Sequence, residues 1–279
     1  MNQFKTFYNL SETSYTKLRA EVHYFLLTDE ISSIIALLKN QYTLFYVGKM
    51  SKLLFAFDYK DLFVVKYVDK TIKVHDTFLE VSSGVSLLEL GNYAIKNGIA
   101  GFEKIMTIPG NVGGSIINNA SFLDQGINDN LLFLQVIDSK GSIKNLKKDD
   151  LDINYRRVNF KEENLFIYRA YFKIERKLRY ELYQSKKKSF SYRLSHQSSK
   201  LSFGSTFKNY KQYKAYELIN KYIDFRSQNG VKISSKHANF LEFNSDEDYI
   251  NIVKIIERVQ EVLYNKLGFY LESEIKIIY

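Results

Sequence analysis

The segment at residues 107–120, "TIPGNVGGSIINNA", constrains the fold most, because it combines the only proline of the chain with three of its thirteen glycines, Gly110, Gly113 and Gly114. Pro109 fixes its own φ and biases Ile108 toward an extended conformation, whereas the glycines permit positive φ and leave room for a ligand. Successive N–H groups in such a turn can bind a phosphate, although the spacing is neither GxGxxG nor a P-loop. Taken alone, the segment predicts a phosphate-binding loop or a plain tight turn.

The composition is that of a globular protein, with 45% hydrophobic and 25% charged residues among 279. No apolar run approaches the ~20 residues that span a bilayer, and the first residues lack the apolar core of a signal peptide. We therefore expect no membrane insertion. The absence of cysteine excludes disulfides and thiolate catalysis, and the four histidines lack metal-ligand spacing. A cytoplasmic protein without a metal is the simplest expectation.

The net charge of +9 suits an anionic partner, either a nucleic acid or a phosphorylated small molecule, or it reflects a lysine-rich composition without further meaning. The densest basic stretch is residues 173–193, which we interpret as a solvated connector. A role of this stretch in steering an anionic ligand remains open. Nucleic-acid binding would need its basic residues and stacking aromatics on one face, and we expect no nucleic-acid partner.

Strands and helices alternate in the first part of the chain. A helix is predicted over residues 29–39 with Asp29 as its cap, and a second helix begins at a capping box of Ser86 and Glu89 and ends near Gly98. Strands are predicted at 43–48, 61–68, 78–84, 131–137 and 165–173. This alternation favours an α/β domain.

A second unit is predicted to begin near residue 190, with a boundary near 185. Its best helix covers residues 246–267, capped by Ser245 and stopped by Gly268. A terminal strand at 270–279 alternates so that Glu272 and Glu274 share one face.

Four blocks of sequence, in order, identify the chain as similar to a known family. Residues 98–120 resemble the flavin-binding signature of the UDP-N-acetylenolpyruvoylglucosamine reductases. The other blocks are "INYRRVNF" at 153–160, "QSSKLSFGSTFKN" at 197–209, and "VKISSKHANFLEF" at 231–243 followed by "LGFYLESEIKII" at 267–278. A chance match of four ordered blocks is improbable.

The resemblance implies an α/β and α+β fold: a two-part FAD-binding domain of the vanillyl-alcohol-oxidase type at 1–75 and 76–185, and a smaller substrate domain at 186–279. It implies NADPH-dependent reduction of UDP-N-acetylglucosamine enolpyruvate to UDP-N-acetylmuramate for peptidoglycan synthesis. We expect a monomer of the shorter family type, because no insertion is available for an extra substrate-covering loop. The alternative is a degenerate, non-catalytic homologue that binds a UDP-sugar or a cell-wall partner.

The resemblance also assigns residues to roles. Arg156 would hold the substrate carboxylate, Ser205 would donate a proton, and Glu274 would assist the enolic intermediate, with Glu272 as its competitor. Substrate-binding positions are Tyr155, Lys208 and Asn209, and Lys208 is also a candidate for activating Ser205. FAD-binding positions are Gly48, Ser51, Ile108, Pro109, Gly110, Val112, Gly113, Gly114 and Asn119. In the "KHANF" stretch, Asn239 is expected to orient backbone or substrate.

The first flavin loop departs from the family pattern. In "VGKMSKLLF" at 47–55, Lys49 and Met50 replace glycines, and Lys52 replaces asparagine. Positive φ at Met50 would cost about 1 kcal/mol or more. Pairing of the two lysines with the FAD diphosphate would offset this cost, or the loop has lost tight FAD binding.

Overall fold

The computed structural model describes residues 2–279, which divide into two compact units. The first unit contains residues 2–8, 22–49 and 61–191, and the second contains residues 9–21, 50–60 and 192–279. The second unit therefore takes two short segments from the early chain in addition to the C-terminal part. The domain boundaries expected at 75 and 185 stay a prediction.

A four-stranded sheet forms one half of the first unit, in the order β1 (Asn2–Asn9), β2 (Glu21–Thr28), β5 (Tyr59–Tyr67) and β3 (Leu44–Val47). The helix α1 (Ile31–Lys39) follows β2 and buries Ile34 and Leu38 against this sheet. The predicted helix is confirmed, but its cap is wrong. Glu30 occupies the N-cap position and makes no side-chain capping bond.

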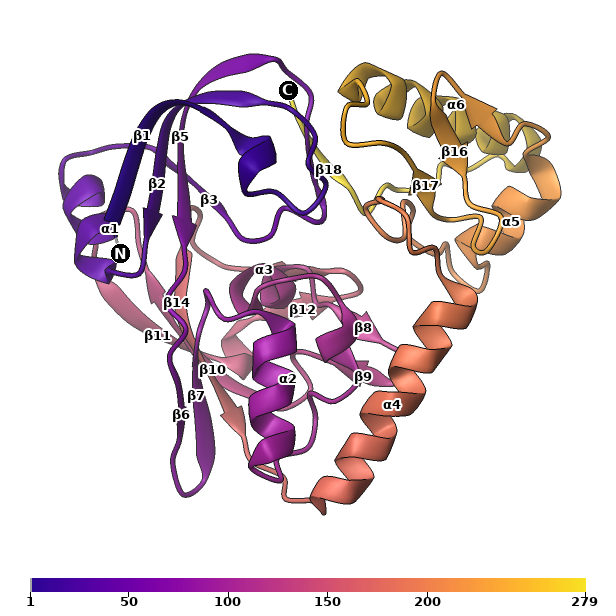
Figure 1. Cartoon of the computed structure of the whole chain (residues 1–279). Coiled ribbons are helices and arrows are strands. Elements are labelled where there is room, and N and C mark those ends of the chain that lie inside the picture. The colour runs from indigo at the N-terminus through magenta and orange to yellow at the C-terminus, as the bar shows by residue number, and fades with distance from the viewer. Residues whose placement is uncertain (1) are drawn as a thin grey trace. The chain divides into compact units, whose positions relative to one another are not determined.

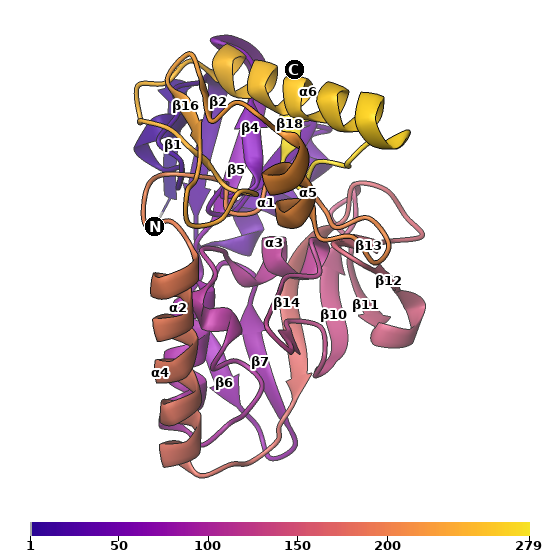
Figure 2. The same cartoon turned by 90° about the vertical axis from the view of Figure 1, so that its right-hand side faces the viewer.

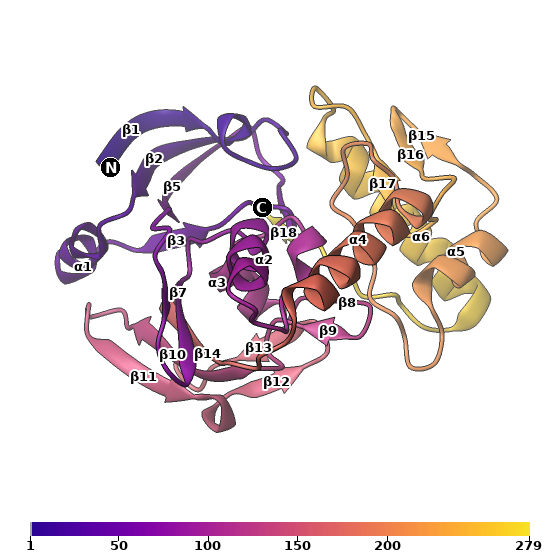
Figure 3. The same ribbon diagram turned by 60° about the horizontal axis from the view of Figure 1, so that its bottom comes forward.

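The other half of the first unit is a five-stranded antiparallel sheet (Figure 1). Its order is β11 (Ile143–Lys147), β10 (Leu131–Ile137), β14 (Phe166–Lys173), β7 (Phe78–Ser82) and β6 (Ile72–Val74). The helices α2 (Leu87–Lys96) and α3 (Val112–Ile117) cover one face of this sheet (Figure 3). The predicted strands and the Ser86–Glu89 capping box are confirmed, the latter by two reciprocal backbone bonds.

Most of the basic stretch is helical, which the sequence did not predict, and the division between the two units falls at residues 191 and 192 within this helix. The helix α4 (Arg179–His196) has 18 residues, of which only Leu182 and Ser189 are buried. It lies beside α2 (Figure 2), where Lys186 Nζ donates a hydrogen bond of 2.9 Å to Asn92 Oδ1. The apolar side chains of α4 do not gather on one face, so its sequence lacks the apolar stripe that marks a packed helix.

The second unit packs its helices against a small sheet. It contains α5 (Ala215–Tyr222), α6 (Tyr249–Leu267), and the strands β15 (Ser227–Gln228), β16 (Val231–Ile233) and β17 (Leu241–Glu242). Gly268 ends α6 at φ +75°, as predicted, but Asp248 rather than Ser245 caps its start. The terminal strand is shorter than predicted: β18 (Lys276–Ile278) pairs in parallel with β4 (Leu53–Phe55).

The remaining elements are short. They are the strands β8 (Ser121–Phe122), β9 (Gln125–Gly126), β12 (Asp152–Asn154) and β13 (Arg157–Asn159), and the 3₁₀ turns Leu10–Glu12, Ile105–Thr107 and Lys148–Asp150. Among the helices of residues 2–279, none is long and apolar enough to cross a bilayer.

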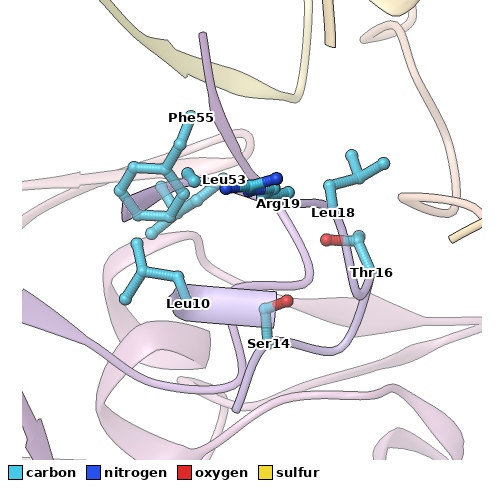
Figure 4. Close-up of a pocket in the computed structure, with 8 residues that line it drawn as sticks. Leu10, Ser14, Thr16, Leu18, Arg19, Leu53 and Phe55 are labelled. Atoms are coloured by element: carbon cyan, nitrogen blue, oxygen red, sulfur yellow. The ribbon is translucent and has the colours of Figure 1, made fainter. Parts of the chain in front are cut away.

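A small cavity lies within the second unit beside β4 (Figure 4). It is lined by Leu10, Ser14, Thr16, Leu18, Ala20, Arg19, Leu53 and Phe55. Its volume of about 10 Å³ is enough for one water molecule. A flavin or a nucleotide sugar cannot enter this space, so it is not the candidate site.

Candidate functional site

The segment that carries Ser205 is held between two other segments of the second unit. Thr206 N donates a bond of 2.7 Å to Asn239 O, and Glu274 N donates one of 2.8 Å to Thr206 O. Ser205 also forms an isolated bridge with Phe240. These bonds bring the predicted proton donor and the predicted acidic residue onto neighbouring segments of the chain.

Asn239 fixes this segment from the buried side. Its amide oxygen accepts a hydrogen bond of 2.9 Å from Phe207 N, and its amide nitrogen donates one of 2.8 Å to Phe207 O. One buried side chain thus satisfies both backbone groups of a residue, as a neighbouring strand would. Of the two roles expected for Asn239, the structure shows the first, because its side chain orients the backbone of Phe207.

A lysine joins the two predicted catalytic groups. Lys52 Nζ lies 3.1 Å from Glu274 Oε2 and donates a hydrogen bond of 2.5 Å to the Ser205 carbonyl oxygen. The Glu274 side chain is only 9% exposed, so an opposite charge is needed to offset its loss of solvent. No local sequence pattern predicts this contact, because the three residues lie far apart in the chain.

The competing acidic residue has a different environment. The Glu272 side chain is 71% exposed and pairs with Lys208, whose Nζ lies 2.5 Å from Glu272 Oε1. Lys208 therefore contacts Glu272 and not the Ser205 hydroxyl, for which it was a candidate activator. Among residues 2–279, none donates to or accepts from that hydroxyl, so it is available to a substrate.

Two further polar residues of the second unit have structural contacts. Asn209 Oδ1 accepts a hydrogen bond of 3.0 Å from Ala215 N, the first residue of α5. The imidazole of His237 packs against Tyr216 and Phe240, and burial lowers its pKa. The substrate-binding role of Asn209 stays a prediction.

In the first unit, two predicted residues form the turn of a hairpin, and a third, Asn119, contacts this turn. Tyr155 and Arg156 form the turn between β12 and β13, where Asn154 pairs with Arg157. Arg156 has φ +57°, an unfavourable value for a side chain larger than glycine. Its Nη1 donates a bond of 2.6 Å to Ser121 Oγ and one of 3.5 Å to Asn119 O. A strained backbone that is held by several contacts is frequent at binding sites.

None of the three glycines of the 107–120 segment adopts positive φ, and two of them are required for close packing. A Cβ on Gly113 would lie 2.9 Å from Ser83 Cβ, and one on Gly110 would lie 2.7 Å from Ser115 Oγ. Gly114 differs, because no atom outside its own helix lies within 4 Å of its Cβ position. Of these three positions, Gly114 is the one at which a ligand can approach closely.

Backbone hydrogen bonds tie the 107–120 segment to the residues just before α2. Val112 N and Gly113 N donate to the carbonyls of Val85 and Ser83, at 2.8 and 3.0 Å, so these two N–H groups are already used. The Val112 side chain is fully buried, and that of Ile108 packs against the same core. The phosphate cradle expected from successive N–H groups therefore does not include these two.

An unsatisfied polar atom marks where a cofactor would be held. Asn111 Oδ1 is buried without a hydrogen-bond partner among the described residues, and it faces Gly48, where a Cβ would lie 3.1 Å from it. Buried acceptors of this kind ordinarily have a donor, so the loops at Gly48 and Asn111 fit a bound group with N–H or O–H donors, such as FAD. Met50 has a positive φ of +55°, the conformation whose cost was considered above, and its side chain is buried.

Comparison with known proteins identifies the family. The UDP-N-acetylenolpyruvoylglucosamine reductase of Prochlorococcus marinus subsp. pastoris is 32% identical over 99% of this chain and 97% of its own length. The chain belongs to the UDP-N-acetylenolpyruvoylglucosamine reductase family. The reductase of Aquifex aeolicus is 31% identical over 89% of the chain and 85% of its own length.

Family models and a solved structure agree with this assignment. The model of the UDP-N-acetylenolpyruvoylglucosamine reductase C-terminal domain matches residues 196–278, and that of an FAD-binding domain matches residues 27–147. The crystal structure of the reductase from Thermus caldophilus has the same fold, with a TM-score of 0.85 and 20% identity over 100% of this chain and 99% of its own. The predicted fold class is confirmed.

Proposed function

We propose that this chain reduces UDP-N-acetylglucosamine enolpyruvate to UDP-N-acetylmuramate, with FAD as cofactor and NADPH as reductant, in peptidoglycan precursor synthesis. The observation that carries the proposal is the grouping of Ser205, Glu274 and Lys52 in a chain of this family. A hydroxyl and a buried carboxylate beside a cation are the groups that an enolate needs for protonation.

The first unit would hold the cofactor through the loops at Gly48, Ile108–Gly114 and Asn119. Bound FAD supplies the hydride, obtained from NADPH, that is added to the terminal carbon of the enolpyruvyl group. Gly114 leaves room for the cofactor, and Asn111 Oδ1 offers it an acceptor. Ser51, which begins the turn into β4, is assigned to the same loop.

The chain's own side chains then handle the negative charge and the proton. Arg156 is assigned to the substrate carboxylate, because a planar guanidinium donates two parallel hydrogen bonds. The Ser205 hydroxyl donates a proton to the carbon that carries this carboxylate and regains one from solvent, so that one hydride and one proton are added across the double bond. Glu274 is assigned to assist the enolic intermediate while this proton is transferred. Substrate contacts are assigned to Tyr155, Lys208 and Asn209.

The visible absorption spectrum of the purified protein, before and after addition of FAD, tests this function. We expect bands near ~370 and ~450 nm that bleach under NADPH and return when the enolpyruvyl substrate is added. A flavoprotein that NADPH reduces and the substrate does not reoxidise would contradict the reaction. A colourless protein that takes up no FAD would contradict the proposal at the first step.

The second candidate function is a non-catalytic homologue that binds a UDP-sugar or a cell-wall partner. The observation that favours it is the strained Met50 in the first flavin loop, because its positive φ disfavours the loop conformation. Binding of a UDP-sugar by a colourless protein would support this alternative.

The setting of the protein is part of the proposal. We assign it to the cytoplasm, because a chain without cysteine gains nothing from an oxidising compartment. We also assign it as a monomer, which light scattering coupled to gel filtration tests. A mass of about twice 32.8 kDa would contradict the monomer.

A further inference from the structure

Lys52 occupies a junction of three segments of the second unit. Its backbone oxygen accepts a hydrogen bond of 2.9 Å from Lys276 N, at the start of the parallel pairing of β4 with β18. Figure 2 shows these two strands side by side. This pairing fixes the backbone of Lys52 and therefore the position of its Cα atom.

The side chain of Lys52 reaches both other segments. Its ammonium group lies 3.1 Å from the Glu274 carboxylate and 2.5 Å from the Ser205 carbonyl oxygen. Gly204 has φ +72°, and a Cβ there would lie 3.7 Å from Lys52 Nζ, so the turn before Ser205 passes directly beside the ammonium. The Glu274 carboxylate and the Ser205 carbonyl oxygen thus both contact the Lys52 ammonium group.

Burial makes this contact energetically important. The side chain of Lys52 is 27% exposed and that of Glu274 is 9% exposed, whereas most ion pairs of the second unit involve well-exposed partners. An ion pair that is largely removed from water is screened little by salt, and loss of one partner leaves the other uncompensated.

We propose that Lys52 is a positioning residue for the reductase reaction, which fixes the Glu274 carboxylate and the Ser205 backbone relative to each other. The inference rests on the proposed function. It gives Lys52 a different role from the pairing with the FAD diphosphate that the sequence suggested. In this role, Lys52 affects proton delivery to the substrate and leaves both FAD uptake and flavin reduction by NADPH unchanged.

The test compares the two half-reactions of the holoenzyme in stopped flow. Lys52→Asn should slow reoxidation of the reduced flavin by the substrate about 10- to 100-fold, the range that small misplacements of reacting groups cause. Flavin reduction by NADPH should stay within about twofold, and Lys52→Arg should recover most of the lost rate because it keeps the charge and the donors. Lys200→Asn is the matched control, because Lys200 also pairs with a largely buried carboxylate, Glu242, at 3.4 Å.

A double-mutant cycle separates positioning from general support of the fold. In a Glu274→Gln background, Lys52→Asn should cost less than about threefold, because there is no carboxylate left to position. An equal cost in both backgrounds, or wild-type reoxidation in Lys52→Asn, would overturn the inference. Loss of FAD uptake in Lys52→Asn would overturn it in favour of the diphosphate contact. A wild-type protein that the substrate does not reoxidise would instead remove the proposed function itself.

Discussion

At the scale of single residues, the two acidic side chains near the C-terminus differ in burial and partner. Glu274 is 9% exposed and pairs with Lys52, whereas Glu272 is 71% exposed and pairs with Lys208. We expect Glu274→Gln to slow reoxidation of the flavin by substrate at least about 100-fold, and Glu272→Gln to change it less than about threefold, because a carboxylate that is mostly in solvent contributes little. Rapid-mixing absorbance at the flavin band measures both rates. The reverse order would show that the assignment is displaced by two residues.

The sequence predicted some of these residues and missed others for a physical reason. Ser205 and Glu274 lie in motifs that match the family, so the resemblance assigns a role to each of them. Lys52 contacts both only after β4 and β18 have paired, and no local pattern encodes such a contact. The strained φ of Arg156 could not be predicted either, because it arises from the pairing of β12 with β13 in a hairpin.

At the scale of elements, α3 distinguishes glycines needed for packing from one available to a ligand. Gly113→Ala places a Cβ 2.9 Å from Ser83 Cβ, so we expect a lower free energy of unfolding by about 1–3 kcal/mol. Gly114→Ala meets no neighbour and improves helix propensity, so the apoprotein should be at least as stable as wild type. Its affinity for FAD should nevertheless fall about tenfold or more if the cofactor lies there. Urea denaturation and FAD titration measure the two effects, and unchanged affinity in Gly114→Ala would place the cofactor elsewhere.

The start of α2 makes a pH-dependent contribution to stability. Burial alone would raise the pKa of Glu89, but its bonds to Lys70 and to the Ser86 cap hold the pKa at about 2. Because the folded-state pKa is lowered, this stabilisation is complete above the unfolded value of about 4.5 and is lost as the pH falls toward 2. We expect Glu89→Gln to be less stable than wild type near pH 7, with a difference that shrinks near pH 3. Denaturant unfolding at both values measures it, and a constant difference would contradict the linkage.

Elements with strong local signals were predictable, and those without such signals were not. The capping box of α2 and the apolar runs of strands β10 and β14 follow from neighbouring residues. The helix α4 has no apolar stripe, since few of its residues are buried, so its charges suggested a connector. The terminal strand is shorter than its alternation predicts, because β18 can extend only along the short β4.

At the scale of the whole molecule, the second unit is completed by residues from the early chain and from its end. Lys276 N donates to Lys52 O at 2.9 Å, and Ala56 N donates to Ile278 O at 2.7 Å, so β18 closes the unit against β4. Deletion of residues 276–279 removes both bonds together with the pairing of β18 and β4, and we expect it to lower the free energy of unfolding by at least about 2 kcal/mol, at about 1 kcal/mol for each of the two bonds. It should also slow reoxidation of the flavin by substrate, because the chain then ends one residue after Glu274 and its carboxylate is no longer held in place by the β18 pairing. Deletion of Tyr279 alone, whose side chain is exposed, is the matched control. Wild-type stability and reoxidation in the longer deletion would mean that the early and late segments of this unit act independently.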